Sequence, residues 1–189
     1  MTSKTLKLIF LFFSLTLFAE QKKAYIISGP ESSGSTFIAR VIAHVVGKDP
    51  IYKEWSGRKW NGDLGDDVVI LHLSQPAGKE FYDLAWFQKT FADYDRYFIL
   101  TTRDVNIIKT SKKKRFKRTK DNAISDQEMS KNILSDIIKN EKFFIWNFET
   151  QIYLKESYFQ LLYDFLEVKS NFFPPDLTDA NAKHIDADS

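Results

Sequence analysis

The chain has 189 residues, 43% hydrophobic and 15% aromatic, which is the size and composition of one folded domain and argues against a disordered segment. Lysine and arginine number 27 against 25 for aspartate and glutamate, a balance that gives no sign of nucleic-acid binding. The absence of cysteine excludes disulfides, thiolate metal sites and cysteine nucleophiles. The three histidines, His44, His72 and His184, do not stand at metal-ligand spacing.

The N-terminal segment has the order of a secretion signal. Lys4 and Lys7 precede the apolar run 8–18, and the small residue Ala19 follows it. The run is too short for a comfortable membrane span. We expect residues 1–21 to be a signal peptide or an N-terminal membrane anchor, the alternative being a helix or strand of the core. The protein would then be exported or held at a membrane through residues 8–18. An anchored protein whose domain faces the cytoplasm is the other alternative.

A short β-branched run over 24–28 predicts the first buried strand. Apolar residues at helical spacing follow over 35–46 and predict a helix that ends at Gly47. Residues 48–66 have the composition of a loop, with three glycines and two tryptophans. A second apolar run predicts a strand over 67–73.

The middle of the chain continues the alternation of helix and strand. We expect a helix over 79–92 and a strand over 97–101. Asp104 stands where it can cap the next helix. Ser125 and Glu128 have the spacing of a capping box and predict a further helix that begins there and ends near residue 140.

The last expected elements are a strand over 143–148, one amphipathic helix over 149–168 and an irregular tail from Phe172. Strands that alternate with helices imply right-handed crossovers, so we expect a single α/β domain over 22–189. Its fold class is a three-layer, mostly parallel sheet of about four to five strands with helices on both faces, as in P-loop NTPases.

The 29–36 segment, Gly-Pro-Glu-Ser-Ser-Gly-Ser-Thr, has the spacing of a phosphate-binding P-loop, Gly-x-x-x-x-Gly-Lys-Ser/Thr, with Ser35 in the place of the lysine. Gly29 and Gly34 allow a tight turn, and the backbone N–H groups of 33–36 would bind an anion at a helix N-terminus. Hydroxyl donors come from Ser32, Ser33, Ser35 and Thr36. The missing lysine argues against ordinary ATP chemistry. A sulfuryl group carries less charge than a terminal phosphoryl group, so its transfer needs no metal, and none is expected.

Arg103 offers a second anion site, because it follows the strand over 97–101. Its guanidinium fork fits a phosphate, and Ser111, eight positions later, could add a hydroxyl. The alternative is an arginine that pairs with an acidic neighbour. Gly29, His72 and Arg103 each lie just beyond a predicted strand, and ligands of parallel sheets gather at that edge, so the three are expected in one site.

The first loop together with the later Thr-Arg-Asp and Ser111 resembles the sulfotransferases that use 3′-phosphoadenosine 5′-phosphosulfate (PAPS). The resemblance implies that Gly34, Ser35 and Thr36 bind the 5′-phosphosulfate, and that Arg103 and Ser111 bind the 3′-phosphate. The segment 68–76, which contains His72, looks like a family strand that ends in a catalytic or substrate-side residue. The segment 179–184 is similar to an Asn-x-Lys-Tyr ending of some members, which makes Lys183 a further binding candidate. The family's Arg-Lys-Gly motif is absent, so further cationic help would come from Arg40, Lys112 or Lys183.

His72 is the first candidate for the general base, since an imidazole can accept a hydroxyl proton near neutral pH. A histidine that only bonds the backbone is the alternative, and Glu31 and Glu54 are the other candidate bases. The basic run 112–118 is either a solvated helix face or a site for an acidic glycan or a nucleotide phosphate. Sugar or adenine rings could stack on three tryptophans that could equally belong to the core: Trp55, Trp60 and Trp86.

These observations predict an enzyme that moves a sulfuryl group from PAPS to an acceptor hydroxyl, most plausibly on a saccharide. One alternative is a P-loop kinase of small metabolites, which would depend on magnesium. The other is a nucleotide- or anion-binding module without catalysis, which would bind adenosine 3′,5′-bisphosphate and turn nothing over.

Overall fold

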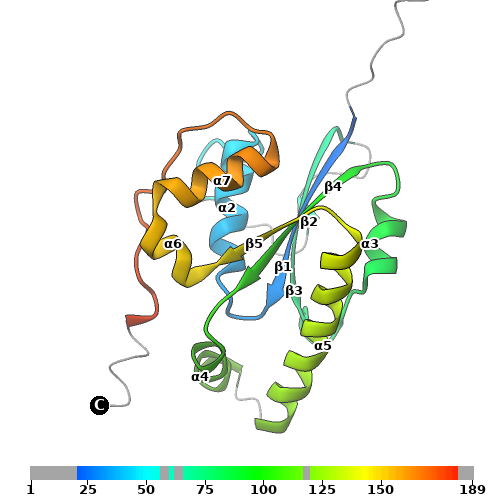
Figure 1. Ribbon diagram of the computed structural model, residues 1–189, viewed down its shortest axis with the longest axis vertical. Coiled ribbons are helices and arrows are strands. Elements are labelled where there is room, and N and C mark those ends of the chain that lie inside the picture. Colours follow the sequence, from blue (N-terminus) through cyan, green and yellow to red (C-terminus); the bar gives the residue numbers. More distant parts are fainter. Residues whose placement is uncertain (1–20, 56–59, 62–65, 117–119, 183–189) are drawn as a thin grey trace, which may run out of the picture.

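Parallel strands form the centre of the fold (Figure 1). The computed structural model of the chain describes residues 21–55, 60–61, 66–116 and 120–182, so the expected signal or anchor lies, except for Gln21, outside the described residues. Within those residues the sheet has five strands in the order β2-β3-β1-β4-β5. Four run parallel: β1 (Lys23–Pro30), β3 (Val68–Gln75), β4 (Asp95–Thr102) and β5 (Phe143–Asn147). The two-residue β2 (Trp60–Asn61) pairs antiparallel with β3 at one edge.

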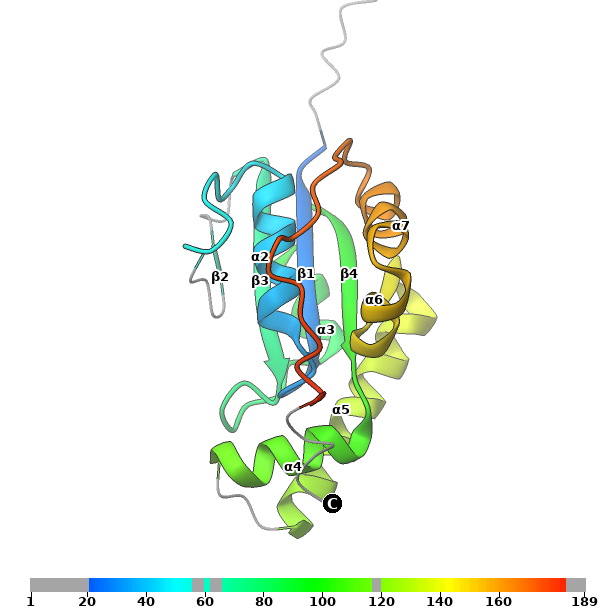
Figure 2. The same cartoon turned by 90° about the vertical axis from the view of Figure 1, so that its left-hand side faces the viewer.

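Helices cover both faces of this sheet, which confirms the three-layer α/β expectation. One face carries α2 (Ser35–Val45), α6 (Phe148–Leu154) and α7 (Glu156–Leu166), and the other carries α3 (Leu84–Thr90) and α5 (Lys120–Asn140) (Figure 1). A further helix, α4 (Val105–Phe116), crosses the edge where the parallel strands end (Figure 2). Within the described ranges, none of the helices combines the length and the apolar character needed to cross a bilayer.

The two faces of the sheet bury separate apolar clusters, because successive strand residues point to opposite sides. In β1, Tyr25 and Ile27 pack with α2 and α7, whereas Ala24 and Ile26 pack with α3 and α5. The first cluster is rich in aromatic rings, and the rings of Trp146 and Tyr158 stack with centroids 4.5 Å apart. Burial on both sides explains why these strands are unbroken apolar runs in the sequence.

Helix starts differ from the expected ones where side chains cap the backbone. Asp83 accepts a hydrogen bond from the Trp86 amide at 2.8 Å, so α3 begins at Leu84, five residues later than the spacing predicted. The cap by Asp104 is confirmed, since its Oδ1 accepts bonds from the amides of Asn106 and Ile107 at 2.8 and 3.1 Å.

Two helix predictions were wrong. Ser125 and Glu128 lie inside α5, which already begins at Lys120, so they form no capping box. The helix expected over 149–168 is two helices, because Lys155 takes a φ of 44° and ends α6 before α7 begins. The loop predicted over 48–66 also contains the short strand β2.

Candidate functional site

The 29–36 loop joins β1 to α2 at the carboxyl edge of the sheet, between β3 and β4. Gly29 is the last residue but one of β1, and a Cβ at this position would overlap the carbonyl oxygen and the side chain of Thr101 in β4. Gly34 has a φ of 89°, which favours glycine, and no side chain caps the amides at the start of α2. The loop therefore places the N-terminus of α2, which has no side-chain cap, beside β4.

Two of the expected hydroxyl donors are used inside the protein. Ser33 Oγ lies 2.6 Å from Thr101 Oγ1, and Ser35 Oγ lies 2.9 Å from His72 Nε2. Both serines are buried, whereas Thr36 is exposed. The side chains of Ser33 and Ser35 thus hold the loop on the sheet, whereas Thr36 is exposed. The amide of Ser33, which was expected to face an anion, instead donates to the Pro30 carbonyl oxygen at 3.1 Å.

Arg103 and Ser111 both reach Ser32 in the middle of the loop. Arg103 Nη1 donates to the Ser32 carbonyl oxygen at 3.1 Å, and Ser111 Oγ donates to Ser32 Oγ at 3.1 Å. The guanidinium carbon lies 4.4 Å from the centroid of the Phe148 ring. Within the described part of the chain, Arg103 hydrogen-bonds a carbonyl and an amide oxygen, and its buried Nη2 has no hydrogen-bond partner.

Burial lowers the pKa of Arg103, while the carboxylates of Glu149 and Asp179 act in the opposite direction. An arginine remains charged under this shift, because its ordinary pKa lies far above neutral. The group is therefore a half-buried cation, one of whose buried nitrogens has no hydrogen-bond partner in the described chain. An anion placed at this nitrogen would supply the missing hydrogen-bond acceptor.

Asn181 is a site residue to which the sequence analysis gave no role, although it lies in the segment 179–184. Its Oδ1 accepts from Arg103 Nε at 2.7 Å, and its Nδ2 donates to Glu149 Oε1 at 2.8 Å. The C-terminal segment brings it there by running along α2 toward α4 (Figure 2). The signal was its place in the 179–184 ending, from which Lys183 was chosen, and Lys183 lies outside the described residues.

His72 lies within β3, opposite Ile27 of β1, and does not follow the strand as expected. It is 6% exposed and contacts the loop through Ser35. The ring of Trp55, also buried, lies 6.2 Å from the imidazole between centroids. His72 thus lies on the face of the sheet that α2 covers and contacts the loop from within the protein.

The other tryptophans and candidate groups are spread more widely. Trp86 belongs to the apolar cluster on the α3 and α5 face, so the core interpretation holds for it. The side chain of Trp60 lies outside the described part of the structure. Arg40 donates from Nε to the Trp55 carbonyl oxygen at 3.2 Å, and Glu54 is exposed to solvent.

Lys112 is the one residue of the basic run 112–118 whose side chain the structure describes, and it does not lie on a solvated helix face. Its side chain is 2% exposed and its Nζ lies 3.7 Å from Oε2 of Glu31, whose side chain is 10% exposed. An ammonium group from α4 therefore lies beside the 29–36 loop. The side chains of 113–118 fall outside the described residues.

A pocket of about 270 Å³ adjoins Arg103 on the side of α6. Its lining includes three carboxylates and the exposed ring of Tyr153; the residues are Asp104, Ile107, Glu149, Ile152, Tyr153, Asp179 and Asn181.

In the ranges that the structure describes, no group of three or more histidine, aspartate or glutamate side chains is arranged to hold a metal ion.

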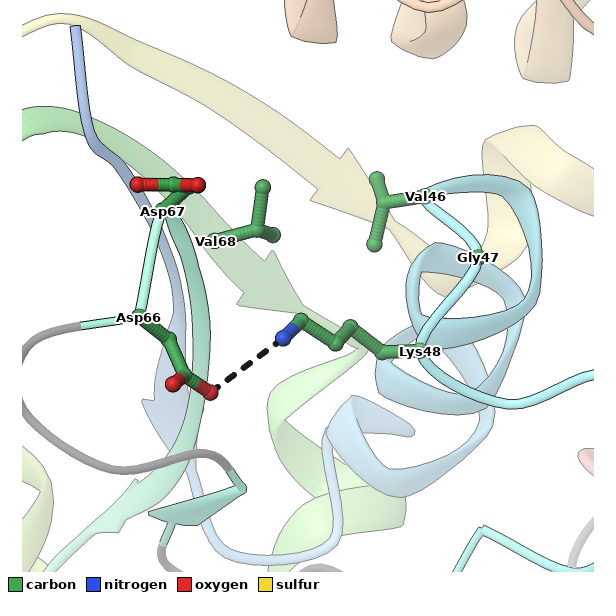
Figure 3. A pocket seen from close by; sticks show the side chains of 6 residues that line it. All are labelled: Val46, Gly47, Lys48, Asp66, Asp67 and Val68. Atoms are coloured by element: carbon green, nitrogen blue, oxygen red, sulfur yellow. Dashed lines mark hydrogen bonds and ion pairs between the residues drawn. The ribbon is translucent and has the colours of Figure 1, made fainter.

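A second hollow lies at the opposite edge of the sheet (Figure 3). It has a volume of about 480 Å³ and is lined by the end of α2 and the start of β3. Lys48 Nζ and Asp66 Oδ2 lie 3.3 Å apart across it, and Val46 and Val68 face one another (Figure 3). This hollow shares no residue with the loop, so the two are separate features.

Comparisons with known protein families, with curated proteins and with solved structures found no match to this chain. The arrangement around Ser32 is therefore the basis on which its function is inferred.

Proposed function

We propose that the protein is a sulfotransferase that moves a sulfuryl group from PAPS to an acceptor hydroxyl. The fold that this proposal uses is a P-loop type of α/β sheet, in which the loop after β1 binds the 5′-phosphosulfate. Exposed Thr36 and the amides at the start of α2 would hold that end of the donor. Arg103 and Ser111 would hold the 3′-phosphate.

One observation carries the proposal: donors from the end of β4 and from α4 converge on Ser32 of the loop. A nucleotide with phosphates at two positions needs two groups of anion donors at neighbouring places. The 29–36 loop supplies the first, and Arg103 with Ser111 supplies the second. The buried Nη2 of Arg103 is a donor that a phosphate oxygen would satisfy.

The reaction would use this arrangement as follows. The acceptor oxygen attacks sulfur, the bond between sulfur and the 5′-phosphate oxygen breaks, and the acceptor proton passes to the imidazole of His72. The products are a sulfate ester and adenosine 3′,5′-bisphosphate. The N-terminus of α2 stabilises the negative charge that grows on the departing phosphate.

The acceptor in this proposal is a hydroxyl-bearing molecule, namely a saccharide. The pocket beside Arg103 is lined by the carboxylates of Asp104, Glu149 and Asp179, so we do not place an acidic glycan there. An acidic acceptor would have to approach from a side other than this pocket. Donor supply also constrains the reaction: an exported form would need PAPS in its own compartment, and an anchored form that faces the cytosol would not.

Calorimetry of the purified full-length chain with adenosine 3′,5′-bisphosphate and with ATP and magnesium tests the proposal. We expect the bisphosphate to bind more tightly, and Arg103→Ala to weaken it by about tenfold to a hundredfold, the value of a hydrogen bond to a charged group. Arg96→Ala is the matched control, because Arg96 pairs with Glu141 at the other end of β4. Preference for ATP would favour the small-metabolite kinase, and an unchanged affinity in Arg103→Ala would remove the second anchor.

A binding module without catalysis is the second candidate, and the burial of His72 favours it. At 6% exposure, with Nε2 at the Ser35 hydroxyl, this imidazole contacts the loop rather than open solvent. Such a module would bind the bisphosphate as tightly as the enzyme does. Incubation with PAPS and a set of hydroxyl acceptors separates the two, since only the enzyme releases bisphosphate in proportion to acceptor.

A further inference from the structure

The 29–36 loop lacks a lysine of its own, yet a lysine side chain lies against it. Lys112 comes from α4, the helix that crosses the carboxyl edge of the sheet (Figure 2). Its neighbour Ser111 hydrogen-bonds Ser32, and Lys112 itself lies 3.7 Å from Glu31. Two consecutive residues of α4 thus contact two consecutive residues of the loop.

The burial of this pair needs a physical account. A lysine side chain with 2% exposure has lost nearly all of its contact with water, which is costly for an ammonium ion. The carboxylate of Glu31 offsets this cost. Glutamate is nevertheless an unfavourable residue in a loop built to bind anions, because its negative charge repels them. Both residues are explained if Lys112 binds the anion at the loop and Glu31 balances the charge of Lys112 when no anion is bound.

We propose that Lys112 is the cation that takes the role of the missing loop lysine, and that Glu31 is an internal counter-ion with which the donor's 5′-phosphosulfate competes for the same ammonium group. This inference rests on the proposed function, because it assigns the cation at one end of the proposed donor. It also makes Glu31 a determinant of specificity. A ligand must carry enough negative charge at the loop to draw Lys112 from its carboxylate.

The flexible four-carbon stem of lysine allows this exchange. The separation of 3.7 Å between Nζ and Oε2 is an ion-pair distance longer than a typical hydrogen bond, so a short movement of the ammonium group can replace one anionic partner by another. Arg103, held by Ser32 and Asn181, is the fixed cation of the site. Lys112 would be the movable one.

Titration of the full-length chain with adenosine 3′,5′-bisphosphate and, in parallel, with inorganic pyrophosphate tests the inference. Glu31→Gln should tighten binding about tenfold, which corresponds to about 1.4 kcal/mol, because Lys112 loses its competing anion. Lys112→Met should weaken binding about tenfold or more. In the double variant, Glu31→Gln should give a smaller gain than it gives alone, because the two residues act on each other.

Matched controls remove an exposed charge of the same sign from α4 and α5. Lys109→Met and Glu128→Gln should change either affinity less than twofold. The gain in Glu31→Gln is the decisive readout, since damage to the fold lowers affinity and does not raise it. If Lys112→Met fails to fold, judged by circular dichroism, Glu31→Gln and the double variant, in which both charges are absent, still decide.

The outcomes separate this inference from the proposed function. If the wild-type chain binds pyrophosphate but not the bisphosphate, the proposed function fails, and the pair is judged on pyrophosphate alone. If the bisphosphate binds and Glu31→Gln gives no gain, or Lys112→Met binds like the wild type, the pair has another role and this inference is overturned. If neither compound binds, both fail.

Discussion

The amino and carboxyl ends of the same parallel strands hold their charges in different ways. At the amino ends, Lys23 pairs with Glu167 and Lys142 pairs with Asp95, each at 2.8 Å, and Glu167 and Lys142 remain more than half exposed. At the carboxyl ends, the Lys112–Glu31 pair is almost fully buried. The same strands run from one end of the sheet to the other. The packing of the strands therefore does not explain why the ion pairs are partly exposed at the amino end and buried at the carboxyl end.

The contrast shows where this fold accepts an energetic cost. Exposed ion pairs are cheap to form and contribute little to stability. Buried polar groups lose their hydration and must be paired within the protein. Six of the buried polar residues of the described structure lie in or beside the loop after β1: Ser33, Ser35, His72, Thr101, Ser111 and Lys112. Costly polar groups concentrated at the ligand-binding edge of a parallel sheet are typical of functional sites.

Gly29→Ala should have the largest effect on stability at the carboxyl end. Its Cβ would overlap the backbone of Thr101 in β4, so the two strands would have to separate, at a cost of about 3 kcal/mol in the free energy of unfolding. Gly47→Ala is the matched control, because Gly47 has a φ of 75° and open space around it, and it should lose about 1–2 kcal/mol. Urea unfolding measures both. An equal loss in the two variants would contradict the close approach of β1 and β4.

His72→Gln tests whether the buried imidazole does chemistry. Glutamine can keep a hydrogen bond to Ser35 but is no general base, so turnover of PAPS should fall about a hundredfold while affinity for the bisphosphate stays within about twofold. His44→Gln is the control, because His44 bonds the Asp49 carbonyl at the far end of α2. Turnover equal to that of the wild type would remove His72 as the base.

Asn181→Ala tests the positioning of Arg103 by the C-terminal segment. Without the amide, the guanidinium loses its 2.7 Å partner and its connection to Glu149, so affinity for the bisphosphate should fall about tenfold. Asn140→Ala, at the exposed end of α5, should bind like the wild type. Calorimetry supplies the measurement, and unchanged binding in Asn181→Ala would show that Arg103 is positioned without it.

Glu167→Gln should have the smallest effect and belongs to the amino end. The hydrogen bond from Lys23 holds the pKa of Glu167 below its ordinary value. A lowered pKa in the fold contributes stability above the ordinary carboxyl range, and this contribution is lost as the pH falls through the folded pKa. The variant should therefore lose less than about 0.5 kcal/mol at pH 7 and a smaller amount near pH 3. Urea unfolding at both pH values measures this, and a larger loss at pH 3 would contradict it.

Much of the fold could be predicted because its strands are buried on both faces. The apolar runs that became β1, β3 and β4 gave a direct signal, as did the spacing of α2. The break at Lys155 could not be predicted, since a lysine with positive φ has no sequence signal comparable to that of glycine. The strand β2 has two residues and depends on the edge of β3 that it pairs with.

The candidate site could be predicted only in part, for a similar reason. Motif spacing identified the 29–36 loop, Arg103 and Ser111, which the structure brings together at Ser32. The contact between Lys112 and Glu31 depends on where α4 crosses the sheet, and the contact of Asn181 depends on the path of the C-terminal segment. Neither path can be inferred from local periodicity.

The hydrogen bond between Arg103 and Asn181 joins residues 78 positions apart, and this has a consequence for biosynthesis. Every strand of the described sheet and the helix α7 leave the ribosome before Asn181 does. A nascent chain that stops after α7 already holds the whole sheet but lacks the amide that orients the arginine. A product that ends between α7 and Asn181 would therefore keep the described strands, while the Arg103 guanidinium would retain only its hydrogen bond to the Ser32 carbonyl oxygen.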